Sequence, residues 1–362
     1  MSAYVVETAA LRENIRTLRS MLAPQTVFWA VVKGDGYGLG AEPLCRVLLE
    51  EGIDHFAATT LAEAQTVRAL SAGAEILMLQ PSCEPGLLEQ LVQLGAVLTV
   101  SSMEDAAVLG AVAQSLGLTA RAHCKIDTGM GRYGFHPDEL QQIMAVYAAP
   151  DIAVCGLYTH FSCAFCSQKE TQRQFAAFEA VIAGLRGAGI DPGMCHCCNS
   201  SAALAYPAMH LDAVRIGSAL LGRVNDAAGR QLRRIGWCES SVEELHWLAP
   251  GASTGYGAGW RAKKKTCLAI VPVGNFHGFA VEKGRDLFRW RDCIRGALSL
   301  LLAGLRGKAL TAEIRGRRYP VRGHVGMLHT AVDVTGSDVR QGDLVRLEIN
   351  PLQQKGLPVE YR

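Results

Sequence analysis

Short apolar runs alternate with amphipathic segments along the first two thirds of the chain. The runs are continuous stretches of apolar residues, which is typical of strands buried on both faces of a sheet. The segments between them repeat their apolar positions with the period of an amphipathic helix, for example over 61–70, 103–116 and 171–187. The expected strands are 26–32, 55–60, 75–80, 96–101, 121–127, 153–160, 194–200 and 213–220.

Eight strands that alternate with helices within about 220 residues match the size of a (β/α)8 barrel. We therefore predict an α/β fold in which residues 10–230 form a barrel of this TIM type. A doubly wound open sheet is the alternative. No G-x-G-x-x-G motif follows the first expected strand to support a dinucleotide-binding version of that sheet.

The pattern changes beyond residue 230, where short β-rich runs are separated by glycine-rich turns. We predict a second, mostly β domain made of residues 231–362 together with 1–9. Its clearest strand candidates are 267–273, 310–314 and 344–349.

A segment at 281–308 interrupts this second domain, because it is basic and then rich in leucine. It predicts one or two inserted helices. We expect their leucines to pack on the surface of the domain, and a lid or an interface helix is the alternative.

The composition is that of a globular protein large enough for two domains, with 362 residues, 49% of them hydrophobic and 19% charged. Lys and Arg number 36 and Asp and Glu 34, so the net charge is only +2. Such a balance argues against nucleic acid or an anionic membrane as the main partner. The N-terminal stretch lacks the features of a secretory signal, and the apolar run at 297–305 is too short to span a bilayer. We expect a soluble cytoplasmic protein.

Twelve cysteines without a secretory signal indicate reduced thiols rather than disulfides. One cluster has the composition of a metal site, although C-x-C-C is not a usual zinc half-site. We expect no metal and read these residues as thiols of the core or of a cleft, with zinc as the alternative. The cluster consists of Cys163, Cys166, Cys195, Cys197 and Cys198, with His160 and His196 nearby.

Lys33 directly follows the first expected barrel strand. Active sites of barrels lie at the C-terminal ends of the strands, where burial lowers the pKa of a lysine and favours Schiff-base chemistry. On this feature alone, a solvated lysine at the start of a loop remains the alternative.

Small polar residues follow the seventh and eighth strands, where barrels commonly bind phosphate. Ser200, Gly217 and Ser218 are suitable donors, especially at the start of a helix, although Ser200 could simply cap a helix. A lysine that can form a Schiff base, combined with a phosphate site, suggests pyridoxal phosphate.

Several motifs then carry a specific resemblance. WAVVKGDGYGLG and KIDTGMGRYGF resemble the two hallmark motifs of the alanine racemase family, the pyridoxal-phosphate amino-acid racemases of fold type III. GLYTHFS, CNSSA, VRIGSAL, TGYGAGW and GHVGMLHTAVDVT follow in the order and spacing of that family. The resemblance covers essentially the whole chain. It implies a barrel with a C-terminal β domain, pyridoxal 5'-phosphate as cofactor, an amino-acid substrate and a head-to-tail homodimer.

The resemblance also implies a role for each matching residue. Lys33 would bind the cofactor and act as one catalytic base, and Tyr256 of the partner subunit would be the base on the opposite face. His160 would pack against the pyridine ring. The phosphate would be bound by Tyr37, Ser200, Gly217 and Ser218.

Other matches concern the substrate. Arg132 would hold the phenolic oxygen of the cofactor or the substrate carboxylate. Lys125 matches a position that is often carbamylated and then orients that arginine. The backbone N–H of Met327, again from the partner subunit, would meet the substrate carboxylate.

Arg215 would sit against the pyridine nitrogen in this family. A guanidinium does not give up its proton, so the nitrogen would stay unprotonated and the ring would withdraw fewer electrons. That favours return of the proton to Cα over transamination, and two bases on opposite faces then give racemisation. A structural salt bridge is the alternative role for Arg215.

This sequence departs from the family pattern near the expected substrate entrance. Asn275 and His277 replace a tyrosine and an aspartate, and Leu328 replaces another aspartate. The segment at 281–308 is longer than usual, and Tyr361 is a candidate for a late tyrosine that often helps to bind phosphate. These changes leave the substrate open, with alanine first and serine or a larger amino acid as alternatives.

Three other functions remain as alternatives. A pyridoxal-phosphate carrier usually consists of the barrel alone. An amino-acid decarboxylase or a D-threonine-type aldolase of related fold is the second alternative. Decarboxylases of this fold use an acidic group at the pyridine nitrogen, which Arg215 opposes. A zinc-binding interaction module would use the cysteine cluster.

Overall fold

The computed structural model describes residues 2–224, 231–281, 290–305 and 310–362. The chain forms two compact units. One unit is Glu7–Ile235, and the other is Gly236–Arg362 together with the N-terminal strand β1 (Ala3–Val6). Within the described ranges, no helix is both long enough and apolar enough to cross a membrane.

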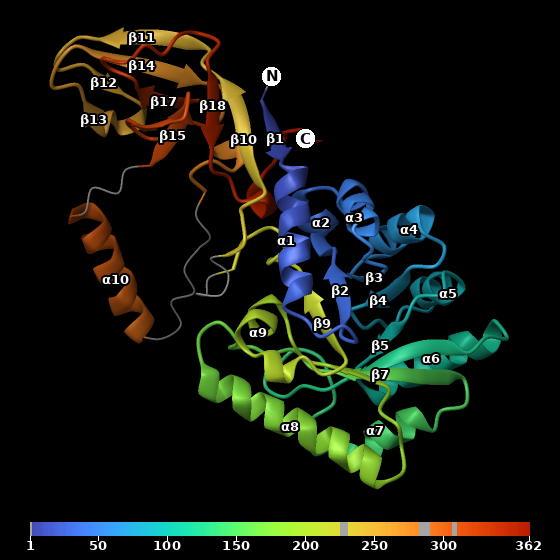
Figure 1. The fold of residues 1–362 in the computed structure, drawn as a ribbon. Helices are drawn as coiled ribbons and strands as arrows, with labels where there is room; N and C mark the ends of the chain where they lie inside the picture. Colours follow the sequence, from blue (N-terminus) through green and yellow to red (C-terminus); the bar gives the residue numbers. More distant parts are fainter. Residues whose placement is uncertain (1, 225–230, 282–289, 306–309) are drawn as a thin grey trace. The chain divides into compact units, whose positions relative to one another are not determined.

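The first unit is a closed barrel of eight parallel strands, so the predicted (β/α)8 fold is confirmed and the open sheet is wrong (Figure 1). The strands follow the order β4-β3-β2-β9-β8-β7-β6-β5. The two ends of this order meet, because Leu77 bridges to Val97 and Val97 N–H donates to the Ile76 carbonyl at 2.7 Å. The strands are β2 (Val27–Val31), β3 (His55–Ala58), β4 (Glu75–Met78), β5 (Leu98–Val100), β6 (Ala120–Lys125), β7 (Ile152–Tyr158), β8 (Met194–His196) and β9 (Ala213–Ile216).

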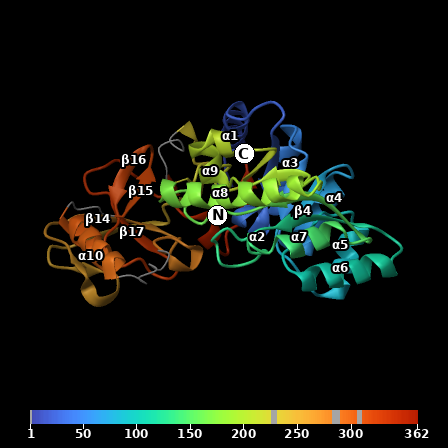
Figure 2. The same cartoon turned by 90° about the horizontal axis from the view of Figure 1, so that it is seen from below.

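The barrel strands are short apolar runs because both of their faces are covered. One buried cluster joins Trp29, Val31 and Ala57 with residues of the neighbouring strands, and helices cover the outer face (Figures 1 and 2). The helices are α1 (Thr8–Ser20), α2 (Lys33–Gly38), α3 (Ala41–Glu50), α4 (Leu61–Leu70), α5 (Pro85–Gln93), α6 (Met103–Ser115), α7 (Leu140–Tyr147), α8 (Gln168–Gly187) and α9 (Ser200–Ala205).

The second unit is mostly β, as predicted. It contains a six-stranded sheet in the order β16-β15-β18-β10-β1-β19, a three-stranded sheet β11-β14-β17 and the small pair β12-β13. The N-terminal strand β1 lies inside the larger sheet, antiparallel to β10 and parallel to β19. The strands are β10 (Gly236–Ser241), β11 (Glu244–Leu248), β12 (Ser253–Thr254), β13 (Trp260–Arg261), β14 (Thr266–Val271), β15 (Thr311–Ile314), β16 (Arg317–Pro320), β17 (Thr330–Asp333), β18 (Leu344–Leu347) and β19 (Val359–Tyr361).

The inserted segment contains the helix α10 (Trp290–Leu305), and residues 282–289 and 306–309 lie outside the described residues. The large apolar side chains of this helix that the structure describes do not pack on the domain, contrary to our expectation. Ile294, Leu298 and Leu301 are 51%, 53% and 65% exposed. The leucine-rich pattern predicted the helix correctly, but a periodic apolar face does not say what covers it.

Candidate active site

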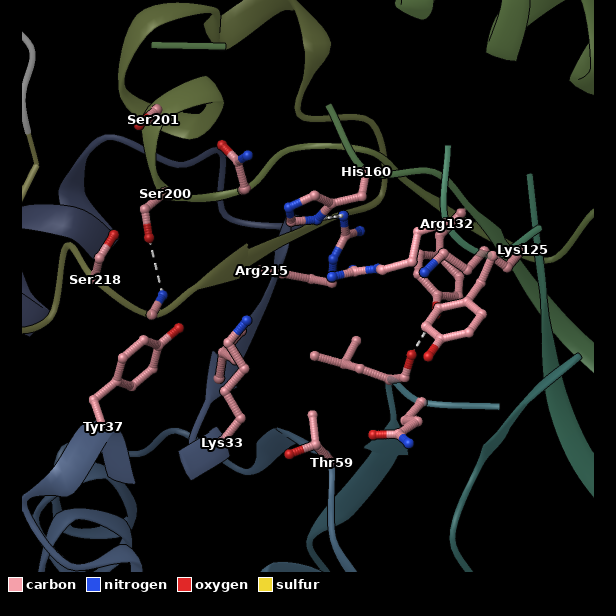
Figure 3. A pocket seen from close by; sticks show the side chains of 17 residues that line it. Lys33, Tyr37, Thr59, Lys125, Arg132, His160, Ser200, Ser201, Arg215 and Ser218 are labelled. Atoms are coloured by element: carbon pink, nitrogen blue, oxygen red, sulfur yellow. Dashed lines mark hydrogen bonds between the residues drawn. The ribbon is translucent and has the colours of Figure 1, made fainter. Parts of the chain in front are cut away.

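A cavity of about 400 Å³ opens at the C-terminal ends of the barrel strands (Figure 3). It contains nine of the eleven predicted site residues: Lys33, Tyr37, Lys125, Arg132, His160, Ser200, Arg215, Gly217 and Ser218. The other lining residues are Val31, Thr59, Leu79, Gln80, Tyr133, Tyr158, Asn199 and Ser201. Tyr256 and Met327 belong to the second unit and line a different pocket.

Among the described residues, the lining of the barrel cavity has four cationic side chains and no carboxylate. The cations are Lys33, Lys125, Arg132 and Arg215. Such a concentration of one charge in a partly enclosed site requires a ligand of opposite charge. A small anion with several negative groups, such as a phosphorylated pyridoxal, therefore fits these residues.

Lys33 is the first residue of α2 and lies two residues after Val31, the last residue of β2. Its side chain is accessible through the cavity, yet the surrounding walls desolvate the ammonium and lower its pKa. Arg132 and Arg215 lower the pKa further, and Glu63 opposes them. A larger fraction of neutral amine is therefore available at neutral pH than for an ordinary lysine.

The residues after Lys33 form a left-handed turn, although they are contained in α2. Gly34, Asp35, Gly36 and Tyr37 all have positive φ between 51° and 63°. Glycine adopts this backbone without strain, whereas Asp35 and Tyr37 do not. Asp35 is held there by hydrogen bonds, because its N–H donates to Glu63 Oε1 at 3.0 Å and its Oδ1 accepts from Ala41 N–H at 2.7 Å. The turn directs Tyr37 into the cavity (Figure 3).

A second part of the cavity is shaped for a phosphate. Ser200 Oγ accepts hydrogen bonds from the backbone N–H groups of Gly217 at 3.0 Å and Ala219 at 3.3 Å, so its own proton is available to a ligand. A Cβ at Gly217 would lie 2.0 Å from the Tyr37 hydroxyl, which leaves room for glycine alone. Burial raises the pKa of Tyr37 to about 12, so the phenol stays a neutral donor.

The alternative interpretation, that Ser200 caps a helix, is wrong. Asn199 is the N-cap of α9, and its Oδ1 accepts from Ala202 N–H at 3.0 Å. The serine hydroxyls are therefore not used to start the helix, and Ser200 faces the cavity.

Arg215 is buried on β9 and pairs with no carboxylate in the described structure, so the alternative of a structural salt bridge is wrong. Its guanidinium donates to the carbonyls of Thr159 at 2.6 Å and of His196 and Cys197 at 3.2 Å each. It also donates to His160 Nδ1 at 3.4 Å and to His196 Nδ1 at 2.5 Å. Backbone and imidazole acceptors thus hold a permanent cation at the cavity wall.

The contact with His196 continues to a second buried imidazole that sequence analysis missed. His196 Nδ1 accepts from Arg215, so its proton is on Nε2, which lies 2.9 Å from His123 Nδ1. Burial lowers the pKa of His123 to about 3 and that of His196 well below its usual value. Both imidazoles are therefore neutral. The available signal was one histidine within each of two otherwise mostly apolar strands, but that signal does not identify a partner.

Lys125 lies at the end of β6 and is nearly completely buried. Burial lowers its pKa to about 8, with further contributions from Arg132 and Arg215. Its ammonium lies 5.4 Å from the ring centres of both Tyr133 and Tyr158. An amine that is partly neutral near pH 8 is a nucleophile, which is the chemical requirement for carbamylation.

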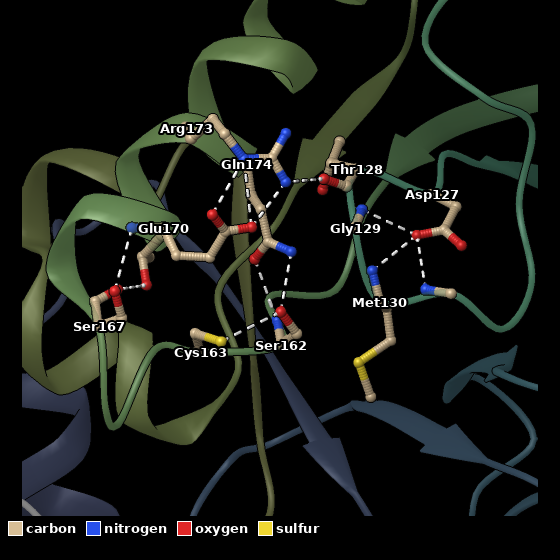
Figure 4. A network of polar contacts seen from close by, with 12 residues as sticks. Asp127, Thr128, Gly129, Met130, Ser162, Cys163, Ser167, Glu170, Arg173 and Gln174 are labelled. Carbon is tan, nitrogen blue, oxygen red and sulfur yellow. Dashed lines mark hydrogen bonds and ion pairs between the residues drawn. The ribbon is translucent and has the colours of Figure 1, made fainter. Parts of the chain in front are cut away.

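The loop that carries Arg132 is built around one carboxylate (Figure 4). Asp127 Oδ1 accepts from the backbone N–H groups of Gly129, Met130 and Gly131 at 2.7–3.1 Å, and Oδ2 accepts from that of Arg132 at 3.1 Å. These bonds lower the pKa of Asp127 although burial opposes them. The guanidinium of Arg132 is thereby presented from an ordered loop.

Two residues of α8 hold neighbouring loops, and sequence analysis did not identify either (Figure 4). Gln174 is fully buried and makes two hydrogen bonds to Ser162. Its Oε1 accepts from the backbone N–H of Ser162 at 3.1 Å, and its Nε2 donates to Ser162 Oγ at 2.9 Å. Arg173 donates to the Thr128 carbonyl at 3.3 Å. A Cβ at Gly129 would lie 2.7 Å from Gln174 Nε2, so the two loops pack closely on this helix.

The cysteine cluster does not form a metal site in the described part of the chain, where no group of three or more His, Cys, Asp or Glu side chains is suitably placed. Cys195, Cys197 and Cys198 are buried, and the last two donate to the Met209 carbonyl at 3.1 and 3.2 Å. Cys163 and Cys166 lie in the loop between β7 and α8.

In the second unit, Tyr256 and Met327 line an open pocket of about 610 Å³. They are 77% and 63% exposed. The Met327 carbonyl accepts from Phe276 N–H at 3.0 Å, but its own N–H has no acceptor among the residues that the structure describes. This unit therefore presents a phenol and a backbone donor on its surface.

The family models match nearly the whole chain. The model "Alanine racemase, N-terminal domain" matches residues 6–224, and "Alanine racemase, C-terminal domain" matches residues 237–359. The chain belongs to the alanine racemase family. The resemblance read from the motifs is confirmed, and the enzyme is an isomerase, an amino-acid racemase.

Named relatives and solved structures agree with this family. An alanine racemase of Desulfovibrio desulfuricans is 32% identical over 340 residues, which cover 91% of this chain and 84% of that protein. One of Desulforamulus reducens is 35% identical over 281 residues, 76% of each chain. The structure of alanine racemase from a D-cycloserine-producing Streptomyces lavendulae aligns with a TM-score of 0.84 at 25% identity, over 100% of this chain and 97% of that one.

The departures from the family pattern cluster in the second unit. Asn275 donates to the Val325 carbonyl at 3.1 Å, and His277 Nδ1 accepts from Gly274 N–H at 3.1 Å. Leu328 is 43% exposed and lines the same pocket as Tyr256, which has two histidines and no carboxylate in its lining. Tyr361 lies in β19 and does not line the barrel cavity.

Proposed function

We propose that this racemase uses pyridoxal 5'-phosphate and interconverts L- and D-alanine, with serine as the next candidate. The observation that carries the proposal is the barrel cavity, with four cations, no carboxylate and an amine at the end of the first barrel strand. The named relatives are alanine racemases, which makes alanine the first substrate to test.

Different residues of the cavity would bind different parts of the cofactor. Lys33 Nζ would bind its aldehyde carbon, and His160 would pack against its ring. When bound, the cofactor withdraws electrons from the amino-acid Cα and so makes its proton acidic. The phosphate would be held by Tyr37, Ser200, Gly217 and Ser218.

Arg215 would determine what happens to the proton. Its guanidinium is a permanent donor and cannot protonate the ring nitrogen. An unprotonated ring draws fewer electrons away from Cα, and the proton then returns to Cα. This favours racemisation over transamination and over decarboxylation.

Two bases would move the proton on opposite faces of Cα. Lys33 would serve one face, since burial lowers its pKa and so increases the fraction of neutral amine that can accept a proton. Tyr256 of a partner subunit would serve the other. The N–H of Met327, also from the partner, and the guanidinium of Arg132 would hold the substrate carboxylate.

A head-to-tail homodimer is part of this proposal. Its support is that Tyr256 and Met327 are largely exposed and that the Met327 N–H has no acceptor in the described ranges. Lys125, as a carbamate, would become an anion that orients Arg132. A cytoplasmic location is also proposed, because all twelve cysteines are thiols.

Mixing two inactive variants tests the function and the dimer together. We expect Lys33→Ala and Tyr256→Phe each to be inactive. When equal amounts of the two variants are unfolded, mixed and refolded, about half of the dimers should be heterodimers. Each heterodimer has one intact site of two, so the mixture should regain about a quarter of wild-type activity. Chiral chromatography of L-alanine incubations measures the activity.

No recovery, with heterodimers shown to form, would contradict a site shared between subunits. If the wild-type holoenzyme forms no D-enantiomer from any L-amino acid, the racemase proposal itself is wrong. Release of carbon dioxide or an aldehyde would assign one of the rival reactions.

A further inference from the structure

The helix α10 presents several large apolar side chains to solvent. Trp290 is 69% exposed, and Ile294, Leu298, Leu301 and Leu302 are between 46% and 65% exposed. Large apolar side chains gathered in this way mark an interaction surface rather than ordinary surface residues.

These five side chains lie on one side of the helix. At about 100° per residue they fall within an arc of about 120°, the width of the buried face of an amphipathic helix. Arg291 falls inside this arc close to one edge, and Arg295 lies just beyond that edge. The Arg291 guanidinium lies 5.5 Å from the Trp290 ring centre, so a cation and an indole stand together at the start of the helix.

The sequence around the helix has a strong local charge. Between residues 282 and 308 it contains seven Lys or Arg and three Asp or Glu, a net charge of +4. The remaining 29 Lys or Arg and 31 Asp or Glu give −2. The nearly neutral total, which argued against an anionic partner, therefore hides one basic segment.

We propose that α10 is a membrane-surface helix that lies on anionic lipid. An apolar face with Trp and Leu, bordered by arginine, is the pattern of helices that bury one side in the headgroup region. The helix is about 24 Å long, too short to span a bilayer. A second copy of the chain is a less suitable partner, because it would bring two basic segments together, whereas anionic lipid neutralises both.

The association is peripheral and independent of catalysis, since none of the described side chains of α10 is among the residues that line the two pockets. Apolar burial and charge attraction contribute together, and each arginine near the surface strengthens binding roughly fivefold. Binding should therefore weaken as the salt concentration rises.

Vesicle sedimentation of the full-length holoenzyme tests the proposal. We expect it to bind vesicles of phosphatidylglycerol mixed with phosphatidylcholine and to bind phosphatidylcholine alone at least tenfold more weakly. The double variant Leu298→Asp/Leu301→Asp should lose binding to the mixed vesicles. Leu118→Asp/Leu352→Asp is the matched control, because these leucines are 46% and 62% exposed outside α10.

Racemase activity without vesicles reports the fold of each variant and should equal that of the wild type. Three results would overturn the proposal: no binding to the mixed vesicles, equal binding to both kinds of vesicle, or unchanged binding of the α10 variant. Self-association without lipid that Leu301→Asp abolishes would instead assign the face to a second copy.

Discussion

The barrel cavity and the pocket of the β unit differ in how their reactive groups are held, because those of the barrel are fixed by hydrogen bonds and those of the β unit are exposed. In the barrel, Arg215 is 3% exposed and makes five hydrogen bonds, and Ser200 is fixed by two backbone donors. In the β unit, Tyr256 and Met327 are 77% and 63% exposed. The barrel holds its groups ready by itself, whereas the β unit offers groups that need a second surface to become a site.

This difference teaches where each function resides. A preorganised cationic cavity suits the binding of a charged cofactor, because its donors need no rearrangement. An exposed phenol suits a step that takes place only when another surface covers it. Changes in the barrel should therefore affect cofactor binding, whereas changes in the β unit should affect the binding or conversion of the substrate and leave the cofactor bound.

The largest expected effect separates these two outcomes directly. Lys33→Ala should lower racemase activity by about 10³-fold or more and abolish the cofactor's absorbance band. Tyr256→Phe should lower activity to a similar degree while the band remains. Absorbance spectra and chiral chromatography measure both. A Tyr256→Phe protein that cannot retain the cofactor would break the comparison.

Gly217→Ala should weaken cofactor binding by about ten- to a hundredfold. The new Cβ would lie 2.0 Å from the Tyr37 hydroxyl and 2.7 Å from its Cζ, so the phenol must leave the phosphate site. Titration of the apoenzyme with pyridoxal 5'-phosphate measures the affinity. Gly73→Ala is the control, because a Cβ there meets nothing within 4 Å; an equal loss in both variants would contradict the steric explanation.

Lys125→Met should stabilise the barrel at pH 7 by up to about 3 kcal/mol. The pKa of Lys125 is lowered to about 8 from 10.5, so the unfolded chain binds more protons between these values. The penalty is complete below pH 8 and disappears as the pH rises towards 10.5. The advantage of the variant should shrink in the same window.

Urea denaturation of the apoprotein at pH 7 and pH 10, in buffer free of carbon dioxide, measures that advantage. Lys169→Met, at an exposed position of α8, serves as the control. An advantage of Lys125→Met that is equal at both pH values would show that burial of the charge is not its cause.

The smallest expected effect concerns the β unit and rests on the proposed function. Leu328→Asp should change alanine turnover little but lower kcat/KM for 2-aminobutyrate relative to alanine by about three- to tenfold, since a charge replaces apolar surface. Leu344→Asp, which is 50% exposed in β18, is the control. An unchanged ratio would remove Leu328 from the specificity of the enzyme.

The sequence predicted the fold well because the apolar runs and helical periods report burial directly. Strand ends also located the cavity, since parallel strands of a barrel bring Lys33, Lys125 and Arg215 to one mouth. Hydrogen-bond partners could not be predicted in this way. Gln174 and Ser162, or His123 and His196, meet only when separate strands and helices assemble, and periodicity carries no information about such pairs.

The helix α10 also shows what the sequence pattern does not predict. Its period predicted an apolar face correctly, but not whether that face was covered. The total charge of +2 was equally uninformative, because a sum over 362 residues conceals where the charges lie. Local patterns of apolar residues predicted secondary structure reliably. Neither these patterns nor the total charge showed what a surface of the protein binds.

The buried chain from Arg215 through His196 to His123 has a consequence for proton traffic. Every donor in it points the same way, and reversing that direction would require a guanidinium to deprotonate. Burial lowers the pKa of His123 to about 3 and that of His196 well below its usual value, so this buried chain of groups does not relay protons at neutral pH. Protons exchanged during turnover must enter and leave through the mouth, and the pH optimum reports on groups located there.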